Sequence, residues 1–389
     1  MANRIIAQKY PETQTEQNQD IITFTPFQSL KELPIPFIQS QCVQHKHELL
    51  ICGGYDTPDC TRDCYSYNTL KNEYKFICKY PSDVQLWGHC VVKLVDNNNN
   101  DGNETTLLSF GGYPYKHTLM MKYVSVWSDD NDNEMKKSNN CNEWIPFTDN
   151  HSNPIIIGRD NDDYRGVRAV IGGSSNHLLF ITYFQKNISV FDLNTFKFIV
   201  HDTLPTDDYI WYHCFVLKPE NEQEQETIKS NEEKNKKEIS EMLLFCFKTG
   251  LSIEYDEDDN TFQVYQLPVC DHIAPLYAYA YVCINNIILF FGGCGCKDDD
   301  LVASKSMHKY SIREYKWMTF QNILPSPFHS CVAIFNEDNT YVHIIGGKND
   351  KKISTSTHMK TQVSKWASEK EVKKGIELKV EKEGKENEI

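Results

Sequence analysis

Short apolar runs that end in a Gly-Gly doublet recur along this chain. Four such runs end at Gly54, Gly112, Gly293 and Gly347. An apolar run of this length bounded by glycine predicts a buried β-strand. The doublet marks a place where a side chain would clash or where φ must be positive. The pattern therefore predicts a chain built from repeated short strands.

A second pattern follows most of these runs, in which one aromatic residue precedes another by seven positions. This spacing predicts two strands joined by a short polar turn. Met359 and Trp366 keep the spacing with one substitution, and an insertion displaces the partner of Tyr123 to Trp144. The aromatic pairs with the regular spacing are Tyr67–Tyr74, Phe191–Phe198, Tyr255–Phe262 and Tyr310–Trp317.

Together the two patterns define six repeat units. The anchoring residues of successive units are 49 to 68 positions apart, which is typical of a four-stranded propeller blade with insertions. The third and fourth units depart from the pattern, because Thr182–Tyr183 and Phe247–Lys248 stand where Gly-Gly is expected. The predicted central strands of the six units are residues 49–52, 107–110, 178–183, 243–247, 287–291 and 341–345.

An apolar strand ending in Gly-Gly, followed by two aromatics seven residues apart, resembles the kelch repeat over residues 21–366. The resemblance implies an all-β, six-bladed β-propeller of four-stranded antiparallel kelch-type blades. It also implies a noncatalytic scaffold that binds a protein or peptide. Galactose oxidase is an enzymatic relative, so a propeller-based enzyme stays open as an alternative, as does a cytoskeletal, actin-associated protein.

The two ends of the repeat region predict how the ring closes. Residues 21–28 precede the first unit and have the pattern of an outer strand, whereas the sixth unit has no strand-like sequence after Trp366. Propellers hide their sheet edges, often by borrowing a strand from the opposite end of the chain. We therefore expect residues 21–28 to pair with the sixth blade.

Polar segments interrupt and flank the repeats. The insertions at residues 97–106, 128–143 and 219–241 fall in loops between the first and second or the third and fourth strands of a blade, counted outward from the axis. All three are therefore predicted on one face. They have few apolar residues, as do residues 1–20 and the charged tail 367–389. This composition predicts solvated, disordered segments.

Composition and charge narrow the class of protein. Hydrophobic residues make up 40% of the 389 positions, enough for a large core. The formal net charge of −14 disfavours nucleic acid and anionic membranes as partners. The start MANRIIAQKYPETQ has no apolar signal segment, and the 14 cysteines suit a reducing compartment. We expect a cytoplasmic protein with a protein or peptide ligand, either monomeric or part of a larger complex.

The sequence has few motifs that indicate metal binding or catalysis. His89, His213 and His329 fall on predicted inner strands, where three imidazoles would suit zinc. Equivalent blade positions lie too far apart for this, so we expect them to pack. The loop cysteines Cys294 and Cys296 lack a second pair at zinc spacing. The chain contains no GxSxG, HExxH or GxxxxGK[ST] motif. We therefore expect no cofactor, no metal and no enzymatic activity.

The face opposite the insertions is the predicted binding surface. It carries the loops between the second and third strands of each blade and the loops between blades. Exposed aromatic and arginine side chains are the usual anchors of protein interfaces. The alternative for each is packing within a blade, which is strongest for Trp87 and Trp211. The candidate partner-binding residues are Arg62, Trp87, Tyr113, Tyr115, Arg165, Trp211, Tyr277, Lys297 and Phe328.

Overall fold

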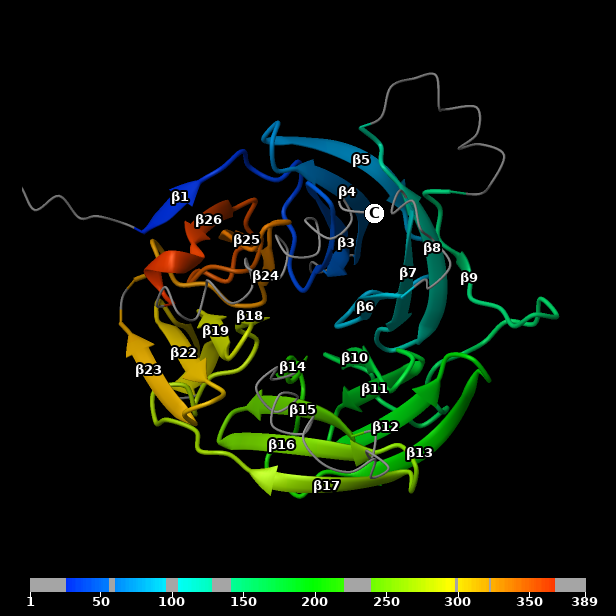
Figure 1. The fold of residues 1–389 in the computed structure, drawn as a ribbon. Helices are drawn as coiled ribbons and strands as arrows, with labels where there is room; N and C mark the ends of the chain where they lie inside the picture. The colour runs from blue at the N-terminus through cyan, green and yellow to red at the C-terminus, as the bar shows by residue number, and fades with distance from the viewer. Residues whose placement is uncertain are drawn as a thin grey trace, which may run out of the picture.

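Six four-stranded antiparallel sheets form a closed ring around a central channel (Figure 1). The computed structural model describes residues 26–55, 60–95, 104–127, 141–219, 239–297, 300–321 and 323–367. No α-helix occurs in this described part of the chain. The protein is therefore an all-β, six-bladed β-propeller, which confirms the fold class predicted from the repeats.

The first four blades are consecutive antiparallel meanders that run outward from the axis. The first blade contains β2 (Gln41–His45), β3 (Glu48–Tyr55), β4 (Cys60–Asn68) and β5 (Glu73–Lys79). The second contains β6 (Cys90–Lys93), β7 (Glu104–Gly111), β8 (His117–Val124) and β9 (Ile145–Pro146). The third contains β10 (Arg168–Gly172), β11 (Leu178–Tyr183), β12 (Asn187–Asp192) and β13 (Lys197–Thr203). The fourth contains β14 (Cys214–Leu217), β15 (Ile239–Cys246), β16 (Thr249–Asp256) and β17 (Thr261–Gln266).

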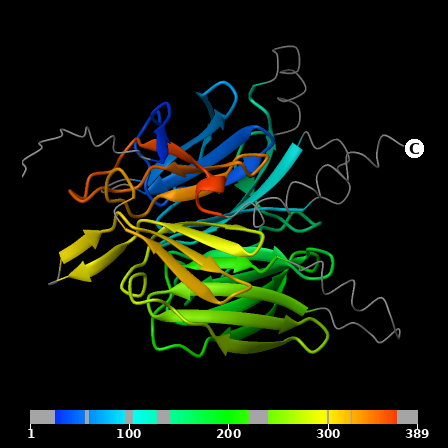
Figure 2. The same ribbon diagram turned by 60° about the vertical axis from the view of Figure 1, so that its left-hand side comes forward.

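The last two blades carry additions to this plan. The fifth contains β18 (Ala280–Ile284), β19 (Ile287–Phe291), β22 (Met307–Ser311) and β23 (Lys316–Phe320). A separate hairpin of β20 (Cys294–Lys297) and β21 (Asp300–Ala303) projects from it (Figure 2). The sixth contains β24 (Val332–Phe335), β25 (Tyr341–Ile345), β26 (His358–Gln362) and, from the other end of the sequence, β1 (Phe27–Ser29).

The second strand of each blade is the predicted Gly-Gly strand. All residues of β11 and β19 are buried. Both faces of a blade pack against neighbouring blades, so such a strand is apolar along its whole length instead of alternating. The cores accordingly lie between blades, as where Leu50 of β3 packs in one cluster with Leu107 of β7. This packing explains why the repeats were readable in the sequence.

The seven-residue aromatic spacing places two rings directly opposite each other on the third and fourth strands. Tyr67 faces Tyr74 and Tyr310 faces Trp317, in each case with ring centroids 4.9 Å apart. The inner ring of each pair is buried and the outer one is half-buried. Cross-strand aromatic pairs stabilise a sheet and fix its register. The same pairing occurs at Phe191–Phe198 and Tyr255–Phe262.

The sixth blade differs, because the N-terminal strand takes its outer position. Ser29 of β1 faces Met359 of β26, so Trp366 has no outer strand to join. Trp366 instead follows the 3-10 turn Val363–Lys365, and its ring packs 5.8 Å from Phe27. The predicted closure is confirmed at residues 27 and 28 and extends to Ser29; residues 21–25 lie outside the described part.

The insertions and the ends fall mostly outside the described residues. This holds for residues 96–103, 128–140 and 220–238 as well as for residues 1–25 and 368–389. β7 starts at Glu104 and β15 at Ile239, so these two strands begin earlier than the sequence predicted. Within the described part, no helix has the length and apolarity to cross a membrane.

Two buried histidines lie at the seam between the sixth and first blades. His343 Nδ1 lies 2.9 Å from His358 Nε2, and His358 Nδ1 bonds the hydroxyl of Tyr74 on β5. Burial lowers the pKa of His343 to about 3 and holds the pKa of His358 well below its ordinary value. Both imidazoles are therefore neutral at pH 7, and this link joins the ends of the ring.

The seam makes stability dependent on pH. An unfolded histidine has a pKa near 6.5, so the unfolded chain binds more protons than the folded one below that value. The contribution is complete above about pH 6.5 and is lost as the pH falls toward 3. For each such histidine the free energy of unfolding should drop by about 1.4 kcal/mol per pH unit. Urea unfolding at pH 7, 6 and 5 measures this, and His343→Gln should flatten the slope; equal stability at all three values would contradict it.

The closing strand gives a second prediction. Phe27 is 7% exposed and packs between Phe291 and Trp366. Removing residues 1–29, or changing Phe27 to Ala, should lower the melting temperature sharply, since truncating a buried Phe costs about 3–5 kcal/mol. Circular dichroism melts measure the effect, with removal of residues 1–25 as the control that keeps β1. A melting temperature equal to that of the control would show that β1 does not hold the ring.

Candidate functional site

Each inner strand is preceded by a residue in the left-handed backbone conformation, two positions before the strand begins. The six φ values lie between +47° and +70°. This conformation turns the chain sharply from the loop between blades into the channel. We call these residues the mouth ring: Gln39, Gly88, Gly166, Tyr212, Ala278 and Ser330.

Backbone hydrogen bonds of 2.7–3.0 Å join members of the mouth ring. The N–H of Gly166 donates to the carbonyl of Gly88, and that of Tyr212 donates to the carbonyl of Gly166. Across the closure, the N–H of Gln39 donates to the carbonyl of Ser330 at 2.9 Å. The ring thus ties adjacent blades together by main-chain atoms, whatever their side chains.

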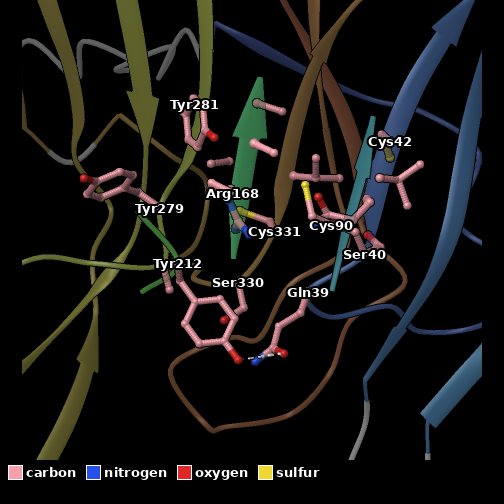
Figure 3. A pocket seen from close by; sticks show the side chains of 17 residues that line it. Gln39, Ser40, Cys42, Cys90, Arg168, Tyr212, Tyr279, Tyr281, Ser330 and Cys331 are labelled. Carbon is pink, nitrogen blue, oxygen red and sulfur yellow. Dashed lines mark hydrogen bonds between the residues drawn. The ribbon is translucent and has the colours of Figure 1, made fainter. Parts of the chain in front are cut away.

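Tyr212 spans the mouth ring. Its hydroxyl donates a 3.1 Å hydrogen bond to Gln39 Oε1, which belongs to the opposite blade (Figure 3). A Cβ on Gly88 would lie 2.9 Å from the Tyr212 hydroxyl, and one on Gly166 would lie 2.9 Å from its Cγ. The two glycines therefore leave the space that the tyrosine occupies.

A pocket of about 210 Å³ lies on the outer side of the mouth ring, on the predicted binding face. Much of its wall comes from the residue that directly precedes each ring member. These five preceding residues are Trp87, Arg165, Trp211, Tyr277 and His329. The regular spacing of the blades thus arranges five side chains around one hollow, which we call the outer pocket.

Aromatic contacts continue around the outer pocket. The rings of Trp211 and Tyr277 stack with centroids 5.7 Å apart and planes at 7°. On the other side, Trp87 stacks on Tyr55 at 5.1 Å and meets Tyr113 edge-on at 5.3 Å. Stacked rings hold each other in place, so they form a rigid, half-exposed apolar wall.

Arg165 joins the two aromatic sides. Its guanidinium lies 4.4 Å from the centre of the Tyr113 ring and 5.0 Å from that of Phe184. It also pairs with Asp163 at 2.7 Å, a bond that raises the arginine pKa further. Such contacts with rings and carboxylate fix the cation at the pocket wall.

Two aromatic residues of this surface were missed from the sequence. In the first blade, the residue just before Gly-Gly is Cys52, which pairs with the first residue of the inner strand, Gln41. In the third blade, the first residue of the inner strand, Arg168, pairs with Thr182. The Gly-Gly position of the third blade is therefore Tyr183–Phe184 and not Thr182–Tyr183. In the fourth blade it is Cys246–Phe247, since Phe245 faces Cys214. Phe184 lies 5.7 Å from Trp211, and Phe247 lies 5.1 Å from Tyr277. The departures from Gly-Gly in these two units were the available signal.

The structure brings some candidate residues together and leaves others apart. Trp87, Arg165, Trp211 and Tyr277 line the outer pocket, and Tyr113 contacts two of them. Of the remaining candidates, Tyr115 is 74% exposed and does not line the pocket, and Arg62 is half-buried on β4. Lys297 ends β20, and its side chain is outside the described part; Phe328 is buried in the core between the fifth and sixth blades.

The three histidines are not equivalent, which corrects the sequence alignment. Val332 and Cys90 occupy equivalent positions, because each begins an inner strand and pairs with the residue just before Gly-Gly. His329 lies three residues before Val332, as Trp87 lies three residues before Cys90. His329 therefore corresponds to Trp87 and not to His89. The two ring nitrogens of His89 instead lie 3.0 and 3.1 Å from the carbonyl oxygens of Leu86 and Cys52. Burial lowers the pKa of His89 to about 4, so the neutral ring carries one N–H and donates to one of these carbonyls.

His213 has a structural contact of its own, with its Nε2 2.6 Å from the hydroxyl of Thr182. Across the residues that the structure describes, no group of three His, Cys, Asp or Glu side chains gathers as a metal site would require. The 13 cysteines whose side chains the structure describes are free thiols.

Comparison with known proteins supports the fold. No family model matches the sequence, and no curated protein matches it. Among solved structures, YjhT matches with a TM-score of 0.54 and 13% sequence identity, over 85% of this chain and 95% of YjhT. At this identity the likeness shows a shared propeller fold and nothing about activity.

The mouth ring makes a prediction about glycine. A Cβ on Gly88 would lie 2.2 Å from the backbone nitrogen of Gly166, and φ there is +70°. Gly88→Ala should therefore destabilise the protein by about 2–4 kcal/mol in urea unfolding. Gly172→Ala is the matched control, because φ there is ordinary and the nearest atoms are side-chain ends at 3.1 Å or more. Equal unfolding free energies for the two variants would refute this explanation of the ring.

Proposed function

We propose that this protein is a noncatalytic kelch-type propeller that binds a protein or peptide through the outer pocket. One observation carries the proposal. The half-exposed rings of Trp87, Trp211 and Tyr277 and the guanidinium of Arg165 surround a single hollow. Tryptophan, tyrosine and arginine are the residue types that dominate binding energy in protein interfaces.

The preorganisation of these side chains favours binding. Each ring is already stacked on a neighbour, and Arg165 is already paired with Asp163. Binding therefore immobilises little that is free, which reduces the entropic cost of association. A hollow of about 210 Å³ has room for one large side chain of a ligand.

The chemistry of the walls suggests the kind of side chain. Arg165 is neutralised by Asp163, and the other large walls are aromatic. An apolar or aromatic side chain, including proline, fits such a surface better than a charged one does. The net charge of −14 further favours a basic or neutral partner over nucleic acid or an anionic membrane. We therefore propose a peptide segment that inserts one uncharged side chain.

The enzyme alternative has less support at this pocket. Of its described lining residues, none is a carboxylate, and His329 is the one imidazole. Burial lowers the pKa of His329 to about 4, so it is neutral at pH 7. A propeller acts through the sites built on it, and fold alone does not supply chemistry. The binding proposal rests on this pocket and not on the fold.

Affinity capture from native lysate tests the proposal. Of the three basic candidates Arg62, Arg165 and Lys297, the structure places Arg165 in the aromatic cluster, so the test variant combines Arg165→Ala with Trp211→Ala. Capture of the specific partner should fall more than about tenfold, as loss of interface hot spots does. Leu70→Ala, at a 73% exposed position in a turn on the opposite face, is the matched control and should capture as wild type does.

Two results would contradict the proposal. The first is a folded double variant, as shown by its circular dichroism melt, that captures the same partners as wild type. The second is purified protein that contains stoichiometric copper and oxidises sugars, which would favour the enzyme alternative. A third result would identify the partner. If the wild type co-sediments with actin and the double variant does not, actin is the protein bound at the outer pocket.

A further inference from the structure

A second cavity lies in the channel itself, on the inner side of the mouth ring. Its volume is about 190 Å³, and the inner strands of the blades form its walls (Figure 3). Gln39, Tyr212, Ala278 and Ser330 line both this cavity and the outer pocket, so the two adjoin at the mouth ring. The inference that follows rests on Arg168, which lines this cavity and not the outer pocket, so it does not depend on the proposed peptide site.

One charged side chain lines the channel cavity among the residues that the structure describes, and it is Arg168. This arginine is the first residue of β10 and is half-buried. Its Nη1 donates a 2.9 Å hydrogen bond to the carbonyl of Val167. In the described part of the chain, no carboxylate lies within 4.0 Å of it. A guanidinium has five N–H donors, so most of its capacity remains for another partner.

The charge of Arg168 acts on several blades. Burial raises the pKa of Cys90 on the second blade to about 11, and the positive charge of Arg168 works against that rise. The same charge acts on Cys214 of the fourth blade and Tyr281 of the fifth. A protein of net charge −14 thus holds a positive charge close to its axis, with the ring of Tyr212 6.0 Å away and no ion-pair partner among the described residues. A partly buried charge without a counter-ion is costly, and a bound anion would offset that cost.

The remaining walls limit which anion fits. Ser40, Ser330 and Tyr281 bring hydroxyl groups, whereas Val91, Ala169, Val332 and Ala333 bring apolar surface. Each inner strand is also an edge strand of its sheet, with main-chain groups that no further strand covers. These features suit a molecule with one anionic end and a short uncharged body.

We propose that the channel cavity binds a small monocarboxylate, with its two oxygens held by the guanidinium of Arg168. A carboxylate matches the planar fork of arginine in a bidentate pair. One cation balances one negative charge, whereas a phosphate near charge −2 lacks a second cation among the described lining residues. At about 30 Å³ for a water molecule, the cavity holds the volume of about six waters, so an acid of about six to ten non-hydrogen atoms fits.

Calorimetry and thermal shift on the full chain test the proposal. The probes are straight-chain acids from acetate to octanoate, the amide of the best acid, inorganic phosphate and chloride. The best acid should bind saturably and raise the melting temperature, and its amide should do neither. Arg168→Gln should weaken binding more than about tenfold, the loss expected for a hydrogen-bonded charge. Arg313→Gln, at an exposed turn of the fifth blade, should bind the acid as wild type does.

Arg168→Lys is a second test variant for the case that Arg168→Gln does not fold, because lysine keeps the positive charge but cannot form the bidentate pair. If Arg168→Gln does not fold, a folded Arg168→Lys with weakened acid binding still supports the bidentate site, and one that binds as wild type does overturns it. The proposal also fails if no monocarboxylate binds the wild type at tens of millimolar. It fails equally if Arg168→Gln binds the acid unchanged, or if phosphate or chloride binds as tightly as the best acid.

Discussion

Six sheets with two apolar faces each are stable only when every face has a neighbour, and the pairing of the last blade with the first meets that requirement. Three contacts illustrate how the ring closes at this seam. β1 completes the sixth sheet by pairing with β26, the N–H of Gln39 bonds the carbonyl of Ser330, and His358 bonds Tyr74. Without the seam, the cores between all blades would lose their lateral support, since each blade packs on the next.

The same geometry produces both cavities. At the mouth ring the chain turns through a left-handed residue, so the residue before it faces outward and the strand after it enters the channel. Trp87, Arg165 and Trp211 therefore surround the outer pocket, while Arg168 and its counterparts line the inner one. Tyr212 is a ring member that lines both cavities, and glycine at 88 and 166 makes room for it. The two sites share a wall but have different chemistry: one is aromatic, and the other holds a single cation.

The sequence predicted what repeats and missed what does not. Apolar runs and aromatic spacings located every second strand and four cross-strand ring pairs, because both depend on local packing. The alignment of His329 with His89 was wrong, since Phe328-His329-Ser330-Cys331 imitates the earlier unit and strand pairing alone reveals the shift. Arg168 was missed for another reason: a cavity built from six distant segments leaves no spacing in the chain to detect.

The central claim is that the outer pocket is the surface on which this propeller acts. Hydrogen–deuterium exchange of the full chain, with and without the partner captured by wild type, tests it most directly. We predict slower exchange around Arg165, Trp211 and Tyr277, with unchanged exchange in the turns on the opposite face, such as the one at Leu70. Protection confined to that opposite face would contradict the claim.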